Sequence, residues 1–165
     1  MPENSPTFRQ AVEQCPDLGM SAWQPGLQAL GQNSQRVRCS DTRRLTGSVF
    51  LGEALKEQYP GSPRWDYGIG WRESRREVAL WIEVHPAHTG EVETVLRKLQ
   101  WLKWWLAASA PALGDITPQD RSPFHWIATD SVSIPKNSPQ ARRLSQSGLR
   151  YPVRILQLGR EEQST

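Results

Sequence analysis

Apolar side chains in the middle of the chain follow two patterns that are typical of β-strands. Residues 65–71 alternate, with aromatic or aliphatic side chains at every second position and Asp66 and two glycines between them. Residues 78–85 are almost continuously apolar, which favours a central strand covered on both faces. One side of that strand is expected to carry Val78, Leu80, Ile82 and Val84, and the other Ala79, Trp81, Glu83 and His85. Because Pro86 lacks a ladder donor, we expect it to end the strand.

Three other segments have the periodicity or the flanking residues of helices. Residues 50–59 have one apolar stripe that ends before Pro60, and residues 91–108 have a longer one. Residues 139–147 follow Ser138, a good N-cap, and begin with a proline. The remaining strands are expected at residues 124–129 and 151–158. This order favours an α/β (α+β) fold with a mixed sheet flanked by helices.

Composition divides the chain into three parts. Residues 1–35 are rich in Gln, Pro, Ser and Gly and show little periodicity apart from a short helical turn near residues 8–12, so we expect an N-terminal arm or poorly packed extension. Residues 36–160 are expected to form a single domain, followed by a C-terminal tail at residues 161–165. The length of 165 residues supports one domain, because domains usually span ~100 to 200 residues.

The register of the first two strands decides which side chains share a face. If the strands form a hairpin whose loop is residues 73–76, counting back along both strands places Asp66 opposite Glu83. Residues that face each other across a pair lie on the same side of the sheet, so His85 joins them there. A loop one residue longer would move the two carboxylates to opposite faces.

Two carboxylates at directly opposed positions need a cation. Their Cβ atoms would lie only ~5 Å apart, and like charges at that separation repel. Mg²⁺ prefers oxygen ligands and is commonly held by one or two carboxylates together with waters and phosphate. Structural roles stay open for each residue alone: Asp66 can cap a turn, Glu83 can pair with Arg72 or Arg76, and His85 can mark the strand end.

The order of these elements and residues resembles the core of the PD-(D/E)XK nuclease superfamily, over roughly residues 45–158. The resemblance implies a restriction-endonuclease-like αβββαβ core and a Mg²⁺-dependent endonuclease, with Mn²⁺ as a possible substitute, that acts on DNA rather than RNA. It assigns Asp66 as the first acidic metal ligand and Glu83 as the second. Glu53, or alternatively Glu57, takes the place of the carboxylate on the first helix.

One position departs from the pattern of that superfamily. Where its members have a lysine two residues after the second acid, this chain has His85. Histidine can act as a general base or hydrogen-bond donor near neutral pH, but it lacks a fixed positive charge. In some members the lysine lies on the following helix, and Lys98 is the candidate there. A solvent-facing position on the helix is the alternative interpretation of Lys98.

Charge and cysteine content narrow the partners and the location. The net charge is only +3, but residues 131–160 contain no acidic residue, a bias that favours a polyanionic partner. The candidate nucleic-acid-binding residues there are Lys136, Arg142, Arg143, Arg150 and Arg154. A partner subunit or a homodimer would supply further targeting. The absence of a long apolar window, of a signal-like start and of a disulfide framework indicates a cytoplasmic protein without a membrane span.

Two other classes of function fit the same residues. A catalytically inactive nuclease-like subunit would bind nucleic acid or a protein partner without cleaving. Glu83, His85 and His88 would alternatively form a transition-metal site, since imidazole and carboxylate both bind Zn²⁺. Trp104 is the tryptophan of residues 101–105 that we expect to be exposed, where it would stack on a nucleobase or contact another chain.

Overall fold

A computed structural model describes residues 5–159 of the chain, and its centre is a four-stranded mixed sheet in the order β2-β3-β4-β5. These strands span Leu45–Phe50 (β2), Tyr67–Glu73 (β3), Arg76–His88 (β4) and Phe124–Ser133 (β5). Neighbours are antiparallel except for β4 and β5, which are parallel. A smaller parallel pair joins β1 (Val37–Cys39) to β6 (Leu156–Leu158). The expected mixed sheet flanked by helices is therefore confirmed.

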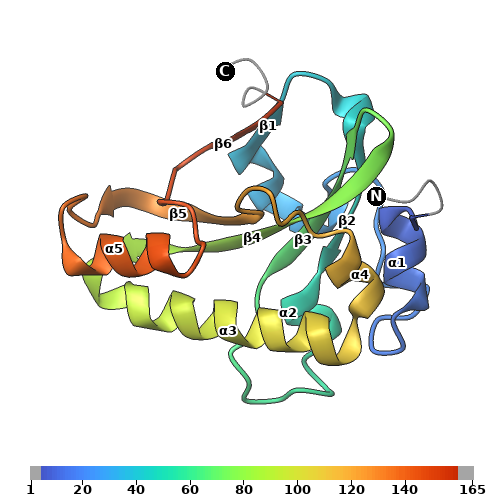
Figure 1. Ribbon diagram of the computed structural model, residues 1–165, viewed down its shortest axis with the longest axis horizontal. Coiled ribbons are helices and arrows are strands. Elements are labelled where there is room, and N and C mark those ends of the chain that lie inside the picture. Colours follow the sequence, from blue (N-terminus) through green and yellow to red (C-terminus); the bar gives the residue numbers. More distant parts are fainter. Residues whose placement is uncertain (1–4, 160–165) are drawn as a thin grey trace.

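Helices lie mainly on one side of this sheet. The α-helices span Phe8–Gln14 (α1), Leu51–Ala54 (α2), Val92–Ser109 (α3), Pro111–Asp115 (α4) and Pro139–Gln146 (α5). Short 3₁₀ turns span Gln28–Arg36 (η1), Thr42–Arg44 (η2) and Thr89–Glu91 (η3). The long helix α3 runs beneath the sheet, with α5 beside it, and the β1–β6 pair lies on the other side (Figure 1). Among residues 5–159, no helix has the length and apolar character needed to cross a bilayer.

The alternation of side chains along β4 separates two hydrophobic clusters, as its sequence predicts. Ala79 and Trp81 belong to the cluster between the sheet and α3, whereas Val78, Leu80 and Ile82 belong to the cluster on the other face of the sheet. The α3 cluster gains space from glycines of β3. Gly68 pairs with Trp81, and a Cβ at Gly68 would lie 2.5 Å from the Trp81 ring. A large indole therefore fits directly over its cross-strand neighbour.

The β3–β4 hairpin has the predicted register, but β4 is longer than predicted. Arg72 pairs with Glu77 and Tyr67 with Ile82, so the hairpin loop has the expected length. The expectation that Pro86 ends the strand is wrong, because β4 continues to His88. The pairing with β5 shifts register between His85 and Ala87. A bulge of this kind leaves room in the ladder for a residue that has no N–H to donate.

Two further elements are shorter than their patterns indicate. The helix expected over residues 50–59 is α-helical only at α2, and the strand expected from residue 151 onward forms a ladder only at β6. In the first case Arg64 donates to the carbonyl of Gly52, which Lys56 N–H would use in a longer helix. Lys56 N–H contacts Glu53 O instead. Leu51 and Leu55 are nevertheless both fully buried.

The N-terminal segment packs into the core, which corrects the expectation of a poorly packed extension for the part from residue 5 onward. Thr7 and Gln10 form a capping box at the start of α1, and Phe8 is fully buried. The Phe8 ring lies against Gly70, where a Cβ would come within 2.6 Å of Phe8 Cβ. The expected C-terminal tail at residues 161–165 lies outside the described residues.

A buried histidine on β5 makes stability depend on pH. Burial lowers the pKa of His125 from 6.5 to about 3, and the charges of Arg150 and Arg121 add to the effect. Between those two values the unfolded chain binds a proton that the folded chain does not, so stability falls as pH falls. Relative to His125→Phe, the wild-type chain is expected to lose about 2 kcal/mol between pH 7 and pH 5, measured by urea unfolding. Parallel pH profiles of the two proteins would contradict this.

Candidate functional site

Two carboxylates from neighbouring strands meet beneath the sheet, on the side of α3. Asp66 directly precedes β3, and Glu83 lies in β4 with none of its surface exposed. Asp66 N–H donates to Glu83 Oε1 at 3.2 Å, and Val84 N–H donates to Asp66 Oδ2 at 3.0 Å. These backbone bonds fix both side chains relative to the strand ends. The hairpin register therefore brings the two predicted acidic residues together on one face.

Lys98 of α3 lies between the two carboxylates. Its Nζ is 3.3 Å from Asp66 Oδ1 and also donates to Glu83 Oε2. Burial by itself would lower the pKa of Lys98, but the charges of Glu83 and Asp66 together outweigh it and raise the pKa. Burial raises the pKa of Glu83, although its contacts with His85 and Lys98 oppose the rise. The ammonium group thus compensates two negative charges in a place that water barely reaches.

His85 extends this cluster to a third carboxylate, that of Glu91. His85 Nδ1 lies 3.3 Å from Glu83 Oε2, and His85 Nε2 lies 2.9 Å from Glu91 Oε2. The contact with Glu83 raises the pKa of His85, burial opposes this, and Glu91 adds to the rise. The contact with His85 in turn lowers the pKa of Glu91. Glu91 belongs to the turn η3 between β4 and α3, and its role has no signal in the spacing of the sequence.

Two sequence candidates remain at the edge of this cluster. The Glu53 side chain is 61% exposed and its carboxylate pairs with Lys56 Nζ at 2.6 Å, although backbone N–H groups of α2 donate to Asp66 O. His88 is likewise exposed, and its Nε2 lies 3.9 Å from Glu91 Oε1. In the described part of the chain, no three His, Cys, Asp or Glu side chains are arranged to hold a metal ion.

The donor chemistry of the acidic pair still suits a hard divalent cation. Asp66 and Glu83 offer carboxylate oxygens, and Mg²⁺ usually keeps several waters and takes only one or two carboxylates from the protein. Lys98 Nζ now contacts one oxygen of each carboxylate, so the lysine and a metal ion would share these atoms. A cation between the two carboxylates therefore requires that Lys98 Nζ move away from at least one of them.

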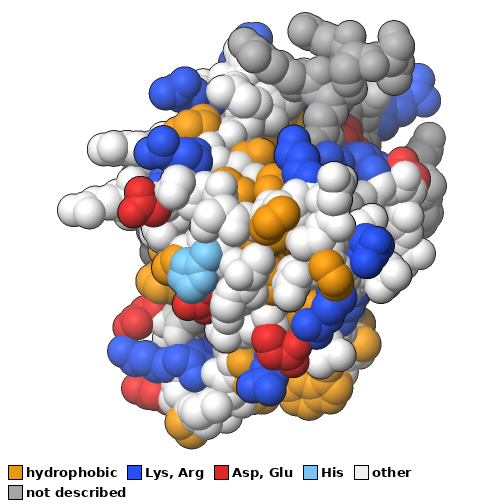
Figure 2. Space-filling model, turned by 90° about the vertical axis from the view of Figure 1, so that its left-hand side faces the viewer, with side chains coloured by type: hydrophobic (Ala, Val, Ile, Leu, Met, Phe, Trp, Pro, Cys, Tyr) orange, Lys and Arg blue, Asp and Glu red, His pale blue; other side chains and the backbone are white. Residues whose placement is uncertain are grey.

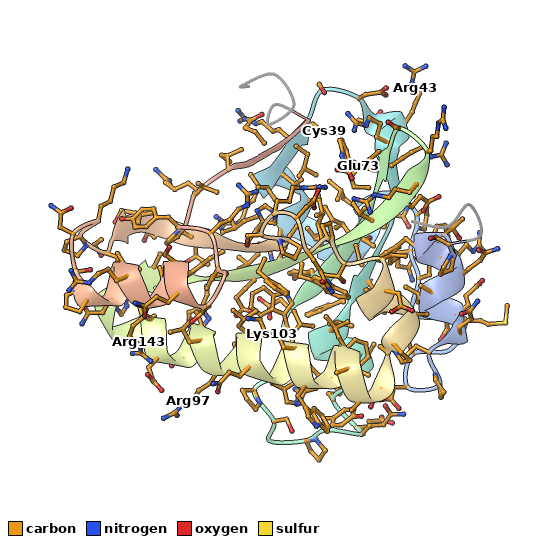
Figure 3. The ribbon with its side chains drawn as sticks, in the orientation of Figure 1. Cys39, Arg43, Glu73, Arg97, Lys103 and Arg143 are labelled. Carbon is orange, nitrogen blue, oxygen red and sulfur yellow. The ribbon has the colours of Figure 1, made fainter. Side chains whose placement is uncertain are left out.

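The basic segment lies beside this region and does not form a single patch. On the side of the molecule drawn in Figure 2, Lys and Arg side chains are spread in separate groups with acidic side chains among them. Arg143 of α5 lies over α3, where its guanidinium is 2.6 Å from Glu93 Oε2 (Figure 3). Lys136 lies over the Tyr151 ring, and Arg150 Nε donates to Ser122 O. Arg142 and Arg154 are exposed.

Trp104 is half exposed, as expected, whereas Trp101 and Trp105 are buried and stacked on each other. The two carboxylates, the Lys98 ammonium group and the His85 imidazole thus form one contiguous cluster of charged and titratable groups. No family model matches the chain, and the chain has no match among curated proteins or solved structures.

Proposed function

We propose that this protein is a Mg²⁺-dependent nuclease-like domain of the PD-(D/E)XK type, which hydrolyses phosphodiester bonds in DNA. One observation carries the proposal: Asp66, directly before β3, converges with Glu83 of β4 and Lys98 of α3. The chain runs α1, β1, β2, α2, β3, β4, α3, α4, β5, which contains the order of a restriction-endonuclease-like αβββαβ core with β1, α2 and α4 added to it. The helix lysine in contact with both acids supports a role for Lys98 in place of the missing strand lysine.

The proposed roles follow from the contacts of each side chain. Asp66 and Glu83 would hold Mg²⁺, or Mn²⁺ in its place, and the bound ion would activate a water and stabilise charge on the phosphate. Lys98 would then bind a phosphate oxygen or orient the attacking water, since its ammonium already lies beside both acids. His85, held between Glu83 and Glu91, is positioned to donate a hydrogen bond or accept a proton at the same place.

The surroundings of the site suggest how nucleic acid would bind. Arg143 ties α5 to the first turn of α3, two residues after Glu91. Basic side chains of α5 would therefore meet the backbone on that side of the cluster, and each neutralised phosphate adds salt dependence. Exposed Arg142 and Arg154 are the most accessible of these side chains. We place the activity in the cytoplasm, in line with the free thiols of Cys15 and Cys39.

Cleavage of defined substrates tests the proposal directly. Supercoiled plasmid and single-stranded RNA are each incubated with Mg²⁺, Mn²⁺ or a chelator. The plasmid is expected to be cut with either metal and left intact with chelator. Glu83→Gln should lower the cleavage rate by about a thousandfold or more, given the several kcal/mol that a bound metal contributes. Glu13→Gln, on the distant helix α1, is the matched control and should cleave normally.

Two outcomes would contradict the proposal. Cleavage that survives both chelator and Glu83→Gln would place the activity elsewhere, in this chain or in a contaminant. Binding of the plasmid without cleavage under every metal condition would instead indicate a catalytically inactive nuclease-like subunit. Retained binding by Glu83→Gln in a gel-shift assay shows that the variant is folded in either case.

A further inference from the structure

A cavity that is partly open to solvent lies on the face of the sheet opposite to the acidic cluster. It has a volume of about 160 Å³ and is bounded by β3, β4, β5 and β6, with Trp71, Leu80 and His125 among its walls. Glu73, near the β3–β4 turn, also lines it and lies on the side of the sheet away from α3 (Figure 3). This volume is several times the roughly 30 Å³ that one water occupies in the liquid.

Two polar side chains in its walls lack hydrogen-bond partners. His125 is 5% exposed and Trp71 is 4% exposed, and within residues 5–159 neither the imidazole nor the indole N–H is hydrogen-bonded, while both groups keep contact with solvent through the cavity. Water or a ligand in the cavity can therefore pair with each of them, since polar groups at such positions usually find a partner. His125 and Gln157 also line a second cavity of about 410 Å³, together with residues of the 150–156 segment. The imidazole and the Gln157 amide thus face open volume from a rigid strand.

The charges around the cavity cancel. Arg121 forms an ion pair with Glu73, both of which line the wall, so neither charge is left uncompensated. The His125 ring is uncharged at neutral pH because burial and the two nearby arginines disfavour its protonated form. An anion would meet the Glu73 carboxylate, and a divalent metal would meet Arg121. A neutral ligand is the class that this wall accommodates without breaking the ion pair.

We propose that the cavity binds a neutral planar heterocycle the size of a single nucleobase, with its edge hydrogen-bonded by His125, Gln157 and the Trp71 N–H. The apolar walls at Leu80 and Leu158 suit the faces of such a ring. A neutral imidazole supplies one donor and one acceptor, and an amide supplies both, which matches a heterocycle that carries a donor beside an acceptor. The inference does not depend on nuclease activity, because His125 and Glu83 lie on opposite faces of the sheet.

Titration of the full-length chain with adenine, hypoxanthine, cytosine and uracil tests the inference. The chain has three histidines, so ¹⁵N-labelled imidazole signals report each one, and comparison with His125→Phe assigns His125. At least one base is expected to shift the His125 signals saturably while those of His85 and His88 stay unmoved. Gln157→Leu should lower the affinity for that base roughly tenfold, which is the effect of one lost hydrogen bond. Gln146→Leu, on exposed α5, is the matched control and should bind normally.

Three results would overturn the inference. The first is that none of the four bases shifts the His125 signals at concentrations up to the solubility limit of the base, which would show that the cavity holds water only. The second is that the shifts persist unchanged in Gln157→Leu, and the third is that they appear equally at His85 and His88. Either result would show that the base binds elsewhere. Because Gln157 is only partly buried, its leucine variant tests the site even if His125→Phe fails to fold.

Discussion

Replacing Lys98 with methionine is expected to lower the free energy of unfolding by about 3–5 kcal/mol, the usual cost of removing one partner from a buried ion pair. Glu83 is fully buried and Lys98 Nζ is its nearest cation, while His85 compensates only part of the charge. Guanidinium unfolding of the wild type and the variant at pH 7 measures the difference. The matched control is Lys56→Met, which breaks the exposed pair with Glu53 and should lower the free energy of unfolding far less than Lys98→Met does.

A second substitution and a metal titration show what the lost stability means. Glu83→Gln in the Lys98→Met background should recover much of the loss, because a neutral amide no longer needs a cation. Mg²⁺ added to Lys98→Met should raise its unfolding midpoint if the freed carboxylates accept the ion. An equal cost for Lys98→Met and Lys56→Met would contradict the close contacts at the site. A midpoint unmoved by Mg²⁺ would argue against the acidic pair as a metal site.

Phe8→Ala is expected to cost about 3–5 kcal/mol, as large-to-small changes at fully buried aromatic residues do. Phe8 belongs to the cluster between the sheet and α3, and its backbone N–H donates to Glu77 Oε1 at 3.0 Å. Urea unfolding followed by tryptophan fluorescence measures the change. Gln14→Ala, at an exposed position of the same helix, should change stability by less than about 0.5 kcal/mol. A small effect of Phe8→Ala would mean that the N-terminal segment is attached loosely after all.

The missed packing of α1 shows where sequence patterns stop. A helix of seven residues carries only two turns of periodicity, and the Gln- and Pro-rich surroundings of Phe8 resemble those of disordered segments. What holds Phe8 is the space above Gly70, some sixty positions along the chain. Complementarity between distant positions leaves no local trace. β3, β4, β5 and α3 were predictable because each has a long periodic pattern of its own, whereas β1 and β2 were not expected.

The candidate site divides in the same way. Asp66, Glu83 and His85 follow from alternation and hairpin register, both of which are local rules. The contact of Lys98 with both acids depends on how α3 rotates and docks, which its apolar stripe fixes only approximately. Glu91 lies in a strand-to-helix turn without any period, so only the folded chain brings it to His85. The partners of the basic side chains likewise depend on where α5 docks on α3.

The glycines of β3 couple the register of the β3–β4 hairpin to the pairing of Asp66 with Glu83. Trp81 and Phe8 occupy the spaces above Gly68 and Gly70. If β3 slid by one position, Ile69 would enter the space that the Trp81 indole requires, and Asp66 would lose its place across from Glu83. Misaligned hairpins are thus rejected by crowding in the core before any ligand arrives. Substitutions at the two glycines should consequently disturb the placement of Asp66 opposite Glu83, although neither carboxylate is itself replaced.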